Sequence, residues 1–298
     1  MTCYLGIHFQ RLTCGGWSFS AKAYLQKAAE KYTRYPLHPH KTPLPTGFVA
    51  TPAQDETVPQ ERITHYQSII GTLLYCATTV RFDISYALST LAQHLKNPSE
   101  NLVKMAYRVL GYLLGTQDLA ISYTRPSTVQ EQYVLYGYTD AGFAACPDSR
   151  RSQQGHVLLF NGGPISWSSK RQPFVCLSTC EAELVALVDT AKTAVFLNKL
   201  LTSLGVGQSR IVIHEDNSSA ISISLRQEPV NTSRTKHMDL RVKWLMEQVN
   251  SGLIAPLYVP SAVNAADIFT KALSPDIFDR LVKLILSPRC NPALSDQV

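Results

Sequence analysis

The stretch Tyr133-Val-Leu-Tyr-Gly-Tyr-Thr-Asp140 determines how the second half of this chain can fold. Its residues alternate in character, so that Tyr136, Tyr138 and Asp140 share one face of a predicted strand. Two further strand patterns run over 153–160 and 164–169. The hairpin signal Asn-Gly-Gly at 161–163 lies between them. We therefore expect three consecutive antiparallel strands in this half of the chain.

Beyond these strands the pattern alternates between helix and strand. The expected elements are helix 179–203, strand 210–214, helix 217–225, helix 235–250, strand 254–259 and helix 265–272. Three antiparallel strands followed by alternating helices and strands give a mixed five-stranded sheet with helices on its faces. The fold class predicted for this half is α/β.

The first part of the chain is dominated by helical spacing. Apolar residues recur at helical intervals over 66–95, and another helix is expected over 99–114. Asp83 precedes an apolar run and is a candidate N-cap. Residues 35–62 contain six prolines and are predicted to form an extended loop or linker.

Four acidic residues of the second half stand in local settings that suit a metal site. They are Asp140 at the end of the first strand, Glu183 in the first turn of a helix with Thr179 as its candidate N-cap, Asp216 at a strand-to-helix junction, and Asp267 at the start of a short helix. Hard divalent cations prefer oxygen ligands, and two such ions about 4 Å apart promote phosphodiester hydrolysis. Any one of these carboxylates alone is more often a solvated surface group or a helix cap.

Several motifs of this half occur in a specific order and spacing. They include Tyr138-Thr-Asp-Ala-Gly, Leu177-Ser-Thr-Cys-Glu-Ala-Glu-Leu, Ile213-His-Glu-Asp-Asn and Asn264-Ala-Ala-Asp-Ile-Phe-Thr-Lys-Ala-Leu. In these motifs the chain resembles the ribonuclease H domain of copia-type LTR retrotransposon Pol polyproteins, which implies a ribonuclease H-like fold. The resemblance implies two Mg²⁺ or Mn²⁺ ions, an RNA–DNA hybrid as substrate and metal-dependent hydrolysis of its RNA strand. It places the catalytic, metal-binding carboxylates on Asp140, Glu183, Asp216 and Asp267, with Glu181 and Glu215 as neighbours.

Three positions depart from the family pattern. Gly142-Phe143 stands where the family usually has Asp-Trp, Gln153-Gln154 replaces small hydroxyl residues, and Lys243 occupies a position that is usually basic or His. None of these departures removes a predicted metal ligand. Together, however, the departures suggest a drifting copy, and the competing hypothesis is a catalytically silent transposon remnant that at most binds nucleic acid.

The first part carries a second resemblance. Tyr4-Leu-Gly-Ile, Tyr66-Gln-Ser-Ile-Ile-Gly and Arg108-Val-Leu-Gly-Tyr are similar to the thumb and connection region of the same family's reverse transcriptase. No Asp-Asp pair occurs in the 298 residues, so polymerase activity is not expected. The domains expected are a truncated thumb and connection over 1–125, a linker over 126–132, a ribonuclease H-like domain over 133–285 and a flexible tail over 286–298.

Substrate contacts are expected mainly from basic and polar residues near the predicted site. Lys170 and Arg171 follow the third strand, where charged residues at a strand end are an equally good explanation. His237 is either a substrate contact or a packed imidazole. Trp167, Phe174 and Trp244 could stack on bases, although core packing is favoured for them. The candidate substrate-binding residues are Lys170, Arg171, Asn217, Arg234, Lys236 and His237.

Composition and charge set limits on the class of protein. Residues 1–130 hold 12 Lys and Arg against 7 Asp and Glu, so most of the net charge of +6 lies there. That excess suits contact with phosphates, and a solvated helix face is the alternative. The absence of a long apolar run, a signal peptide or Cys-x-x-Cys spacing predicts an intracellular protein, cytoplasmic or nuclear, without membrane partners. Other Pol domains are candidate partners.

Overall fold

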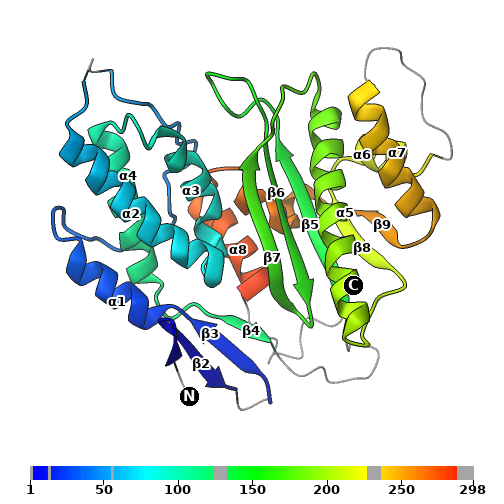
Figure 1. Ribbon diagram of the computed structural model, residues 1–298, viewed down its shortest axis with the longest axis horizontal. Helices are drawn as coiled ribbons and strands as arrows, with labels where there is room; N and C mark the ends of the chain where they lie inside the picture. The colour runs from blue at the N-terminus through cyan, green and yellow to red at the C-terminus, as the bar shows by residue number, and fades with distance from the viewer. Residues whose placement is uncertain (1–2, 13–14, 55–56, 124–132, 227–235, 287–298) are drawn as a thin grey trace. The chain divides into compact units, whose positions relative to one another are not determined.

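The computed structural model describes residues 3–12, 15–54, 57–123, 133–226 and 236–286 (Figure 1). Contacts between Cα atoms divide the chain into two compact units. Unit 1 consists of Met1–Arg125 together with Lys271–Val298, and unit 2 is Pro126–Thr270. Unit 1 is therefore built from both ends of the sequence.

Unit 2 contains the predicted mixed sheet of five strands, in the order β7-β6-β5-β8-β9 (Figure 1). β5 pairs antiparallel with β6, and β6 pairs antiparallel with β7. On its other side β5 pairs in parallel with β8, which pairs in parallel with β9. The strands are β5 (Leu135–Gly142), β6 (Gln153–Phe160), β7 (Gly163–Arg171), β8 (Ile211–Glu215) and β9 (Ile254–Tyr258).

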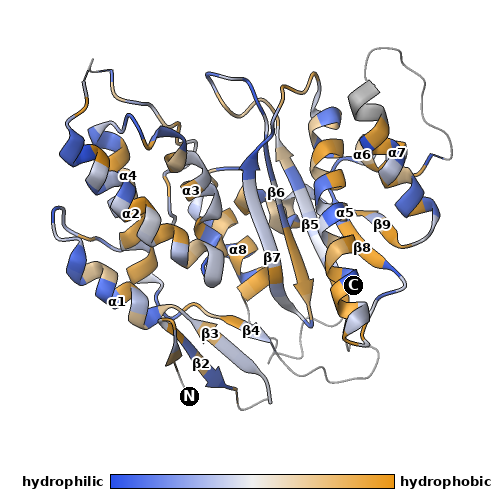
Figure 2. Cartoon of the chain, in the orientation of Figure 1, coloured by the Kyte–Doolittle hydropathy of each residue, from blue (hydrophilic) through white to orange (hydrophobic). Residues whose placement is uncertain are grey.

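Three α-helices pack in this unit, and the longest of them runs beside the central strand (Figure 1). They are α5 (Thr179–Ser203), α6 (Ser218–Ser224) and α7 (Lys236–Asn250). A buried apolar cluster joins α5 to the sheet through Leu187, Leu135 and Ile213, and α7 contributes Leu245. Figure 2 shows apolar residues along α5 and β8, where this cluster lies. The predicted strand and helix order is confirmed, while the last expected helix is a short 3₁₀ segment, η5 (Ala265–Phe269).

Unit 1 combines helices with a small antiparallel sheet that the sequence patterns did not predict. The sheet has the order β1-β2-β3-β4, and its last strand comes from a distant part of the chain. Its strands are β1 (Cys3–Tyr4), β2 (Ile7–Arg11), β3 (Trp17–Ser20) and β4 (Ile121–Tyr123). The helices are α1 (Lys22–Lys31), α2 (Gln60–Thr79), α3 (Ser85–Leu91), α4 (Glu100–Gly115) and α8 (Pro275–Leu286), with 3₁₀ segments η1 (Phe82–Ile84) and η2 (Ala92–His94).

Helix α8 belongs to unit 1, whereas the sequence analysis placed it at the end of the ribonuclease H-like domain. The ring of Phe278 meets Tyr112 of α4 edge-on, with ring centroids 5.8 Å apart. The proline-rich loop also reaches the segment before α8, because Gly47 N–H donates to the Ala272 carbonyl at 3.1 Å. The expected linker 126–132 lies outside the described residues, as does nearly all of the expected tail, and the functional division of the chain stays a prediction.

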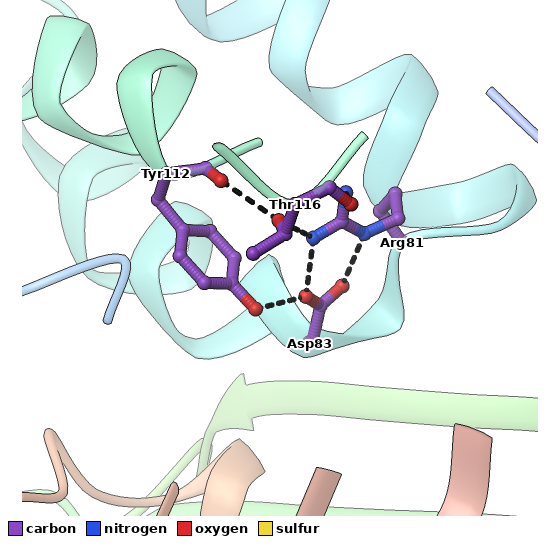
Figure 3. Close-up of polar contacts among 4 residues, drawn as sticks. All are labelled: Arg81, Asp83, Tyr112 and Thr116. Atoms are coloured by element: carbon purple, nitrogen blue, oxygen red, sulfur yellow. Dashed lines mark hydrogen bonds and ion pairs between the residues drawn. The ribbon is translucent and has the colours of Figure 1, made fainter. Parts of the chain in front are cut away.

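Asp83 is not an N-cap, which corrects the prediction from sequence. Its carboxylate lies in η1 and accepts two hydrogen bonds from the guanidinium of Arg81, at 3.0 and 2.7 Å (Figure 3). Tyr112 O–H donates to the same carboxylate at 2.5 Å, and Arg81 also donates to the carbonyl and the hydroxyl of Thr116. The side chains of Arg81 and Asp83 are 1% and 0% exposed, so this network ties the start of α3 to α4 inside the core.

In the described part of the chain, no helix combines the length and the apolar character needed to cross a membrane.

Candidate metal centre

Three of the four predicted carboxylates come together in unit 2. Asp140, Glu183 and Asp216 each place a carboxylate oxygen within 4.8 Å of the others. Asp140 and Glu183 are buried, at 1% and 6% exposure, and Asp216 is partly exposed. Such closely spaced anionic oxygens are the donor set that a hard divalent cation prefers.

The local structure explains why these three side chains converge. Asp140 lies near the end of β5, and Asp216 directly follows β8, the parallel neighbour of that strand. The carboxyl ends of parallel strands meet at one edge of a sheet, which brings the two aspartates together. Glu183 lies in the first turns of α5, the helix that packs against β5.

Two side-chain hydrogen bonds fix the start of α5. Ser178, not the predicted Thr179, is the N-cap, and its hydroxyl accepts from Glu181 N–H at 3.1 Å. The Glu181 carboxylate accepts in return from Leu177 N–H at 2.6 Å. The first bond satisfies one free N–H of the first turn, and the second ties the residue before the N-cap to that turn, so together they fix the start of the helix that carries Glu183. Glu181 thus has a structural role, in agreement with its exclusion from the predicted ligands.

Asp267 is not part of the three-carboxylate group, although the sequence analysis expected it there. It lies in η5 and is 7% exposed. Two contacts tie its segment to β5. Thr270 donates from Oγ1 to Oδ2 of Asp140, and Asn264 donates from Nδ2 to the carbonyl of Thr139 at 3.0 Å. A role for Asp267 as a metal ligand stays a prediction.

Gly155 allows this close approach of η5 to the sheet. It pairs with Asp140 across β5 and β6. A Cβ atom at Gly155 would lie 2.4 Å from the Cβ of Phe269, which no side chain could tolerate without displacing η5. The glycine is therefore required for η5, and with it Thr270, to reach Asp140.

A further acidic side chain, Glu215, is buried close to Asp216 and Asp140. Its side chain is fully buried at the end of β8, and Asn217 N–H donates to Oε1 at 3.0 Å. Burial raises the pKa of Glu215 well above its ordinary value, and the nearby charges of Asp216 and Asp140 raise it further. Sequence reasoning treated Glu215 only as a neighbour of a ligand, because its burial is not visible in the pattern Ile213-His-Glu-Asp-Asn.

The candidate substrate contacts have mixed outcomes. Lys170 pairs with Asp189 of α5 at 2.9 Å, and Arg171 donates to the Cys146 thiol at 3.3 Å. Asn217 caps α6 by accepting from Ala220 N–H at 3.0 Å. Arg234 lies outside the described residues, and of Lys236 and His237 the structure describes only the backbone at the start of α7. None of these contacts tests a role in substrate binding, which stays a prediction for all six residues.

Two of the three candidate stacking aromatics pack in or beside the core. Trp244 lies against the main apolar cluster, and the ammonium of Lys192 sits 5.9 Å from its ring. Phe174 packs against a smaller cluster, with the Arg241 guanidinium 5.2 Å from its ring. These contacts favour the core-packing interpretation for both residues.

Residues that position the carboxylates were missed by sequence reasoning. Thr270 and Asn264 both lie in the quoted motif Asn264-Ala-Ala-Asp-Ile-Phe-Thr-Lys-Ala-Leu, but only Asp267 of that motif was assigned a role. The signals available in the sequence were the hydroxyl of Thr270, three residues after Asp267, and the amide of Asn264, three residues before it.

The sheet order, with antiparallel β6 and β7 on one side of β5 and parallel β8 and β9 on the other, defines unit 2 as a ribonuclease H-like domain. The homologues of this chain are Pol polyproteins of copia-type transposons from plants and yeast. That of transposon TNT 1-94 from Nicotiana tabacum is 31% identical over 270 residues, covering 89% of this chain and 20% of the relative. That of transposon RE2 from Arabidopsis thaliana is 32% identical over 296 residues, covering 98% and 20%.

A putative transposon Ty5-1 protein of Saccharomyces cerevisiae is 34% identical over 189 residues, covering 63% of this chain and 59% of the relative. The chain thus spans about a fifth of the length of the two plant polyproteins. No protein-family model matches the sequence. The family resemblance drawn from the motifs is confirmed by these homologues.

Solved structures give weaker likenesses. The N-terminal ribonuclease H domain of a Mycobacterium tuberculosis protein is 16% identical, covers 51% of this chain and 98% of that chain, and gives a TM-score of 0.36. A foamy viral protease-reverse transcriptase in complex with RNA/DNA hybrid is 14% identical, covers 88% and 29%, and gives a TM-score of 0.47. The fold assignment therefore rests on the strand order of unit 2, not on these scores.

Proposed function

We propose that unit 2 is a metal-dependent ribonuclease H that hydrolyses the RNA strand of RNA–DNA hybrids. The observation that carries the proposal is the convergence of Asp140, Glu183 and Asp216 within 4.8 Å. These residues come from a strand, a helix and a strand-to-helix junction that are far apart in the sequence. The homology supports the choice of a hybrid as substrate, because the two plant relatives are retrovirus-related Pol polyproteins.

The donor set fits Mg²⁺ or Mn²⁺. Three carboxylates and no thiolate or imidazole form the group, which is the chemistry of a hard-cation site. Two such ions, when bound, would activate water and stabilise the charge on the attacking and leaving oxygens. Asp140, Glu183 and Asp216 would hold them, and Asp267 is proposed as a further ligand from the adjacent η5.

The chain's own residues prepare this site in several ways. The hydrogen bonds of Ser178 and Glu181 fix the start of the helix that carries Glu183, while Thr270 fixes the orientation of Asp140. Side chains held in this way need little reorganisation when a cation binds, which favours both affinity and geometry. Discrimination of RNA from DNA would come from contacts to 2′-hydroxyl groups along the minor groove.

A second candidate function is nucleic-acid binding without catalysis. The observation in its favour is that Asp267 stands outside the three-carboxylate group. Under this alternative unit 2 would bind hybrid but would not cleave it. Polymerase activity is not proposed, because the sequence lacks an Asp-Asp pair.

An assay with a labelled RNA–DNA hybrid distinguishes the two candidates. We expect cleavage of the RNA strand with Mg²⁺ or Mn²⁺, and none with a chelator. Asp216→Asn should abolish cleavage, while Glu247→Gln, which removes an exposed acid on α7, should not change it. Binding of the hybrid without cleavage by the wild-type chain at any concentration of either metal would favour the alternative.

A further inference from the structure

Part of the proline-rich loop of unit 1 is held tightly against helix α4. A Cβ atom at Gly111 would lie 2.2 Å from the carbonyl oxygen of His38, and one at Gly115 would lie 2.9 Å from the Cβ of Pro39. The two glycines lie one turn apart on α4, so they form a groove that the loop backbone enters. This contact fixes the loop residues that follow Pro39 beside the same helix.

Arg108 lies one turn before Gly111 on α4 and joins the loop through its guanidinium. Nη1 lies 3.0 Å from Nδ1 of His40, and Nη2 donates to the hydroxyl of Thr42 at 3.4 Å. A guanidinium can only donate, so Nδ1 of His40 accepts and the ring proton is on Nε2. The Nε–H of Arg108 is buried and has no hydrogen-bond partner among the described residues, so the donors that remain for a ligand are N–H groups of Nη1 and Nη2 and the imidazole Nε2–H.

The positive charge of Arg108 has no carboxylate partner in the described part of the chain. Its recorded contacts are the imidazole of His40 and the hydroxyl of Thr42. Burial lowers the pKa of Arg108. The pKa of His40 is lowered first by burial and then by the positive charges of Arg108 and His38, with no acid acting on it.

Acidic residues are scarce around this contact. Residues 31–54 and 101–117 include no Asp or Glu, and the carboxylate of Glu100, at the start of α4, accepts from Tyr35 and lies 3.5 Å from the Nε of Arg62. Lys104 lies one turn before Arg108 on α4 and is exposed, and Lys41 is exposed next to His40. Half-buried cations are normally paired, so a guanidinium that has no carboxylate partner among the described residues and lies beside exposed lysines indicates an anionic ligand.

We infer that Arg108 and His40 form a phosphate-binding site on unit 1, separate from the carboxylates of unit 2, that takes a phosphate of a nucleic-acid backbone. The planar guanidinium fork matches two oxygens of one phosphate, and the adjacent imidazole N–H supplies a third donor. Thr42, which is buried and donates to the Leu44 carbonyl, orients the guanidinium from behind. The choice of nucleic acid as the source of the phosphate rests on the function proposed for unit 2.

The test is binding of the full chain to a fluorescent DNA duplex of about 20 base pairs in the presence of a chelator, between roughly 50 and 200 mM salt. Arg108→Gln should weaken binding about tenfold at the lowest salt and reduce the slope of log affinity against log salt by about one. Arg108→Lys, which keeps the charge but loses the fork, should bind with intermediate affinity. The matched control is Lys283→Gln, because Lys283 is exposed but pairs with Asp279 at 2.7 Å.

Lys104→Gln provides a second variant that carries little risk to folding, because this residue is exposed, and it should also reduce the salt slope. A wild-type slope in both Arg108→Gln and Lys104→Gln would overturn the site. So would binding to an acidic peptide that depends on Arg108 while duplex binding does not. The assay needs neither metal nor cleavage, so it can fail or succeed independently of the nuclease proposal, and Asp216→Asn should bind the duplex at least as well as the wild type.

Discussion

Thr270 donates a hydrogen bond to the carboxylate of Asp140 across 130 residues of sequence. Both side chains are buried, at 1% exposure each. The bond occupies one carboxylate oxygen of Asp140 and restricts rotation of that carboxylate. Asp140, Glu183 and Asp216 each have a carboxylate oxygen within 4.8 Å of the others. The residue that follows a short 3₁₀ segment near the end of unit 2 thus orients a candidate metal ligand near the beginning of that unit.

Thr270→Val should weaken divalent-metal binding about 10- to 100-fold, because it removes a partner that orients Asp140. Thr270→Ser keeps the hydroxyl and should retain most of the affinity. The measurement is a calorimetric titration of the metal-free chain with Mn²⁺. Equal affinities for the valine and serine variants would show that the hydroxyl has no part in metal binding.

Neutralising one carboxylate should not reduce the stability of the metal-free protein. Asp140, Glu183 and Asp216 bring three carboxylates into a small volume, and the charges of Asp216 and Asp140 raise the pKa of the buried Glu215 nearby, so Asp216→Asn relieves repulsion. We expect the melting temperature in chelator to stay level or rise. Added Mg²⁺ should stabilise the wild type, and we expect this stabilisation to be lost in Asp216→Asn. A lower melting temperature in chelator for Asp216→Asn, with no change for Glu247→Gln, would contradict this account.

The buried pair of Arg81 and Asp83 should be sensitive to the loss of one partner. Asp83→Asn leaves the guanidinium without its counter-charge in the core and should destabilise the protein by about 3–5 kcal/mol. Tyr112→Phe removes only one hydrogen bond to the same carboxylate and should cost roughly 1.5–3 kcal/mol. Denaturant unfolding would measure both losses of unfolding free energy, and native-state hydrogen exchange of α4 would check them. The prediction is wrong if Tyr112→Phe lowers the free energy of unfolding more than Asp83→Asn does.

His156 should make stability depend on pH between about 7 and 5. Burial lowers its pKa to about 4, with Asp189 opposing and Lys170 adding to the shift. The folded state therefore binds a proton less readily than the unfolded state, whose His pKa is about 6.5. Stability is full above the unfolded pKa and falls as pH drops, by about 2 kcal/mol between pH 7 and 5.

Replacing His156 removes this dependence and leaves the other titrating groups in place. Thermal melts of the wild type and His156→Gln at the two pH values give the comparison. We expect the loss of stability on acidification to be smaller in the variant by about that amount. The same loss in both proteins would mean that protonation of His156 does not oppose folding.

The fold of unit 2 was predictable because its signals are local. Alternation over Tyr133–Asp140, a glycine-rich hairpin and long apolar helices each indicate one element, and their order leaves few sheet topologies. Helix α5 was predicted with its observed limits, 179–203. The small sheet of unit 1 was missed because its strands have two to five residues and its last strand lies about 100 residues beyond the others.

The candidate site was predictable to the extent that motif spacing identified its carboxylates. Three of the four converge as expected, but the separation of Asp267 from the group depends on how η5 packs against β5, which no local pattern encodes. Asp83 was misassigned as a cap for the same reason. A carboxylate before an apolar run suits a cap, and only the tertiary structure brings the guanidinium of Arg81 into contact with it.

Because unit 1 is completed by helix α8, its folding cannot finish until unit 2 has been synthesised. During translation Tyr112 cannot contact Phe278, and the loop residue Gly47 cannot contact Ala272, until all of unit 2 has been synthesised. Unit 2 is a continuous insertion between the two parts of unit 1. Unit 2 can fold as a self-contained insertion before that closure. A cut at residue 270 would therefore leave the carboxylates with their own domain but remove from unit 1 the helix that seals its core.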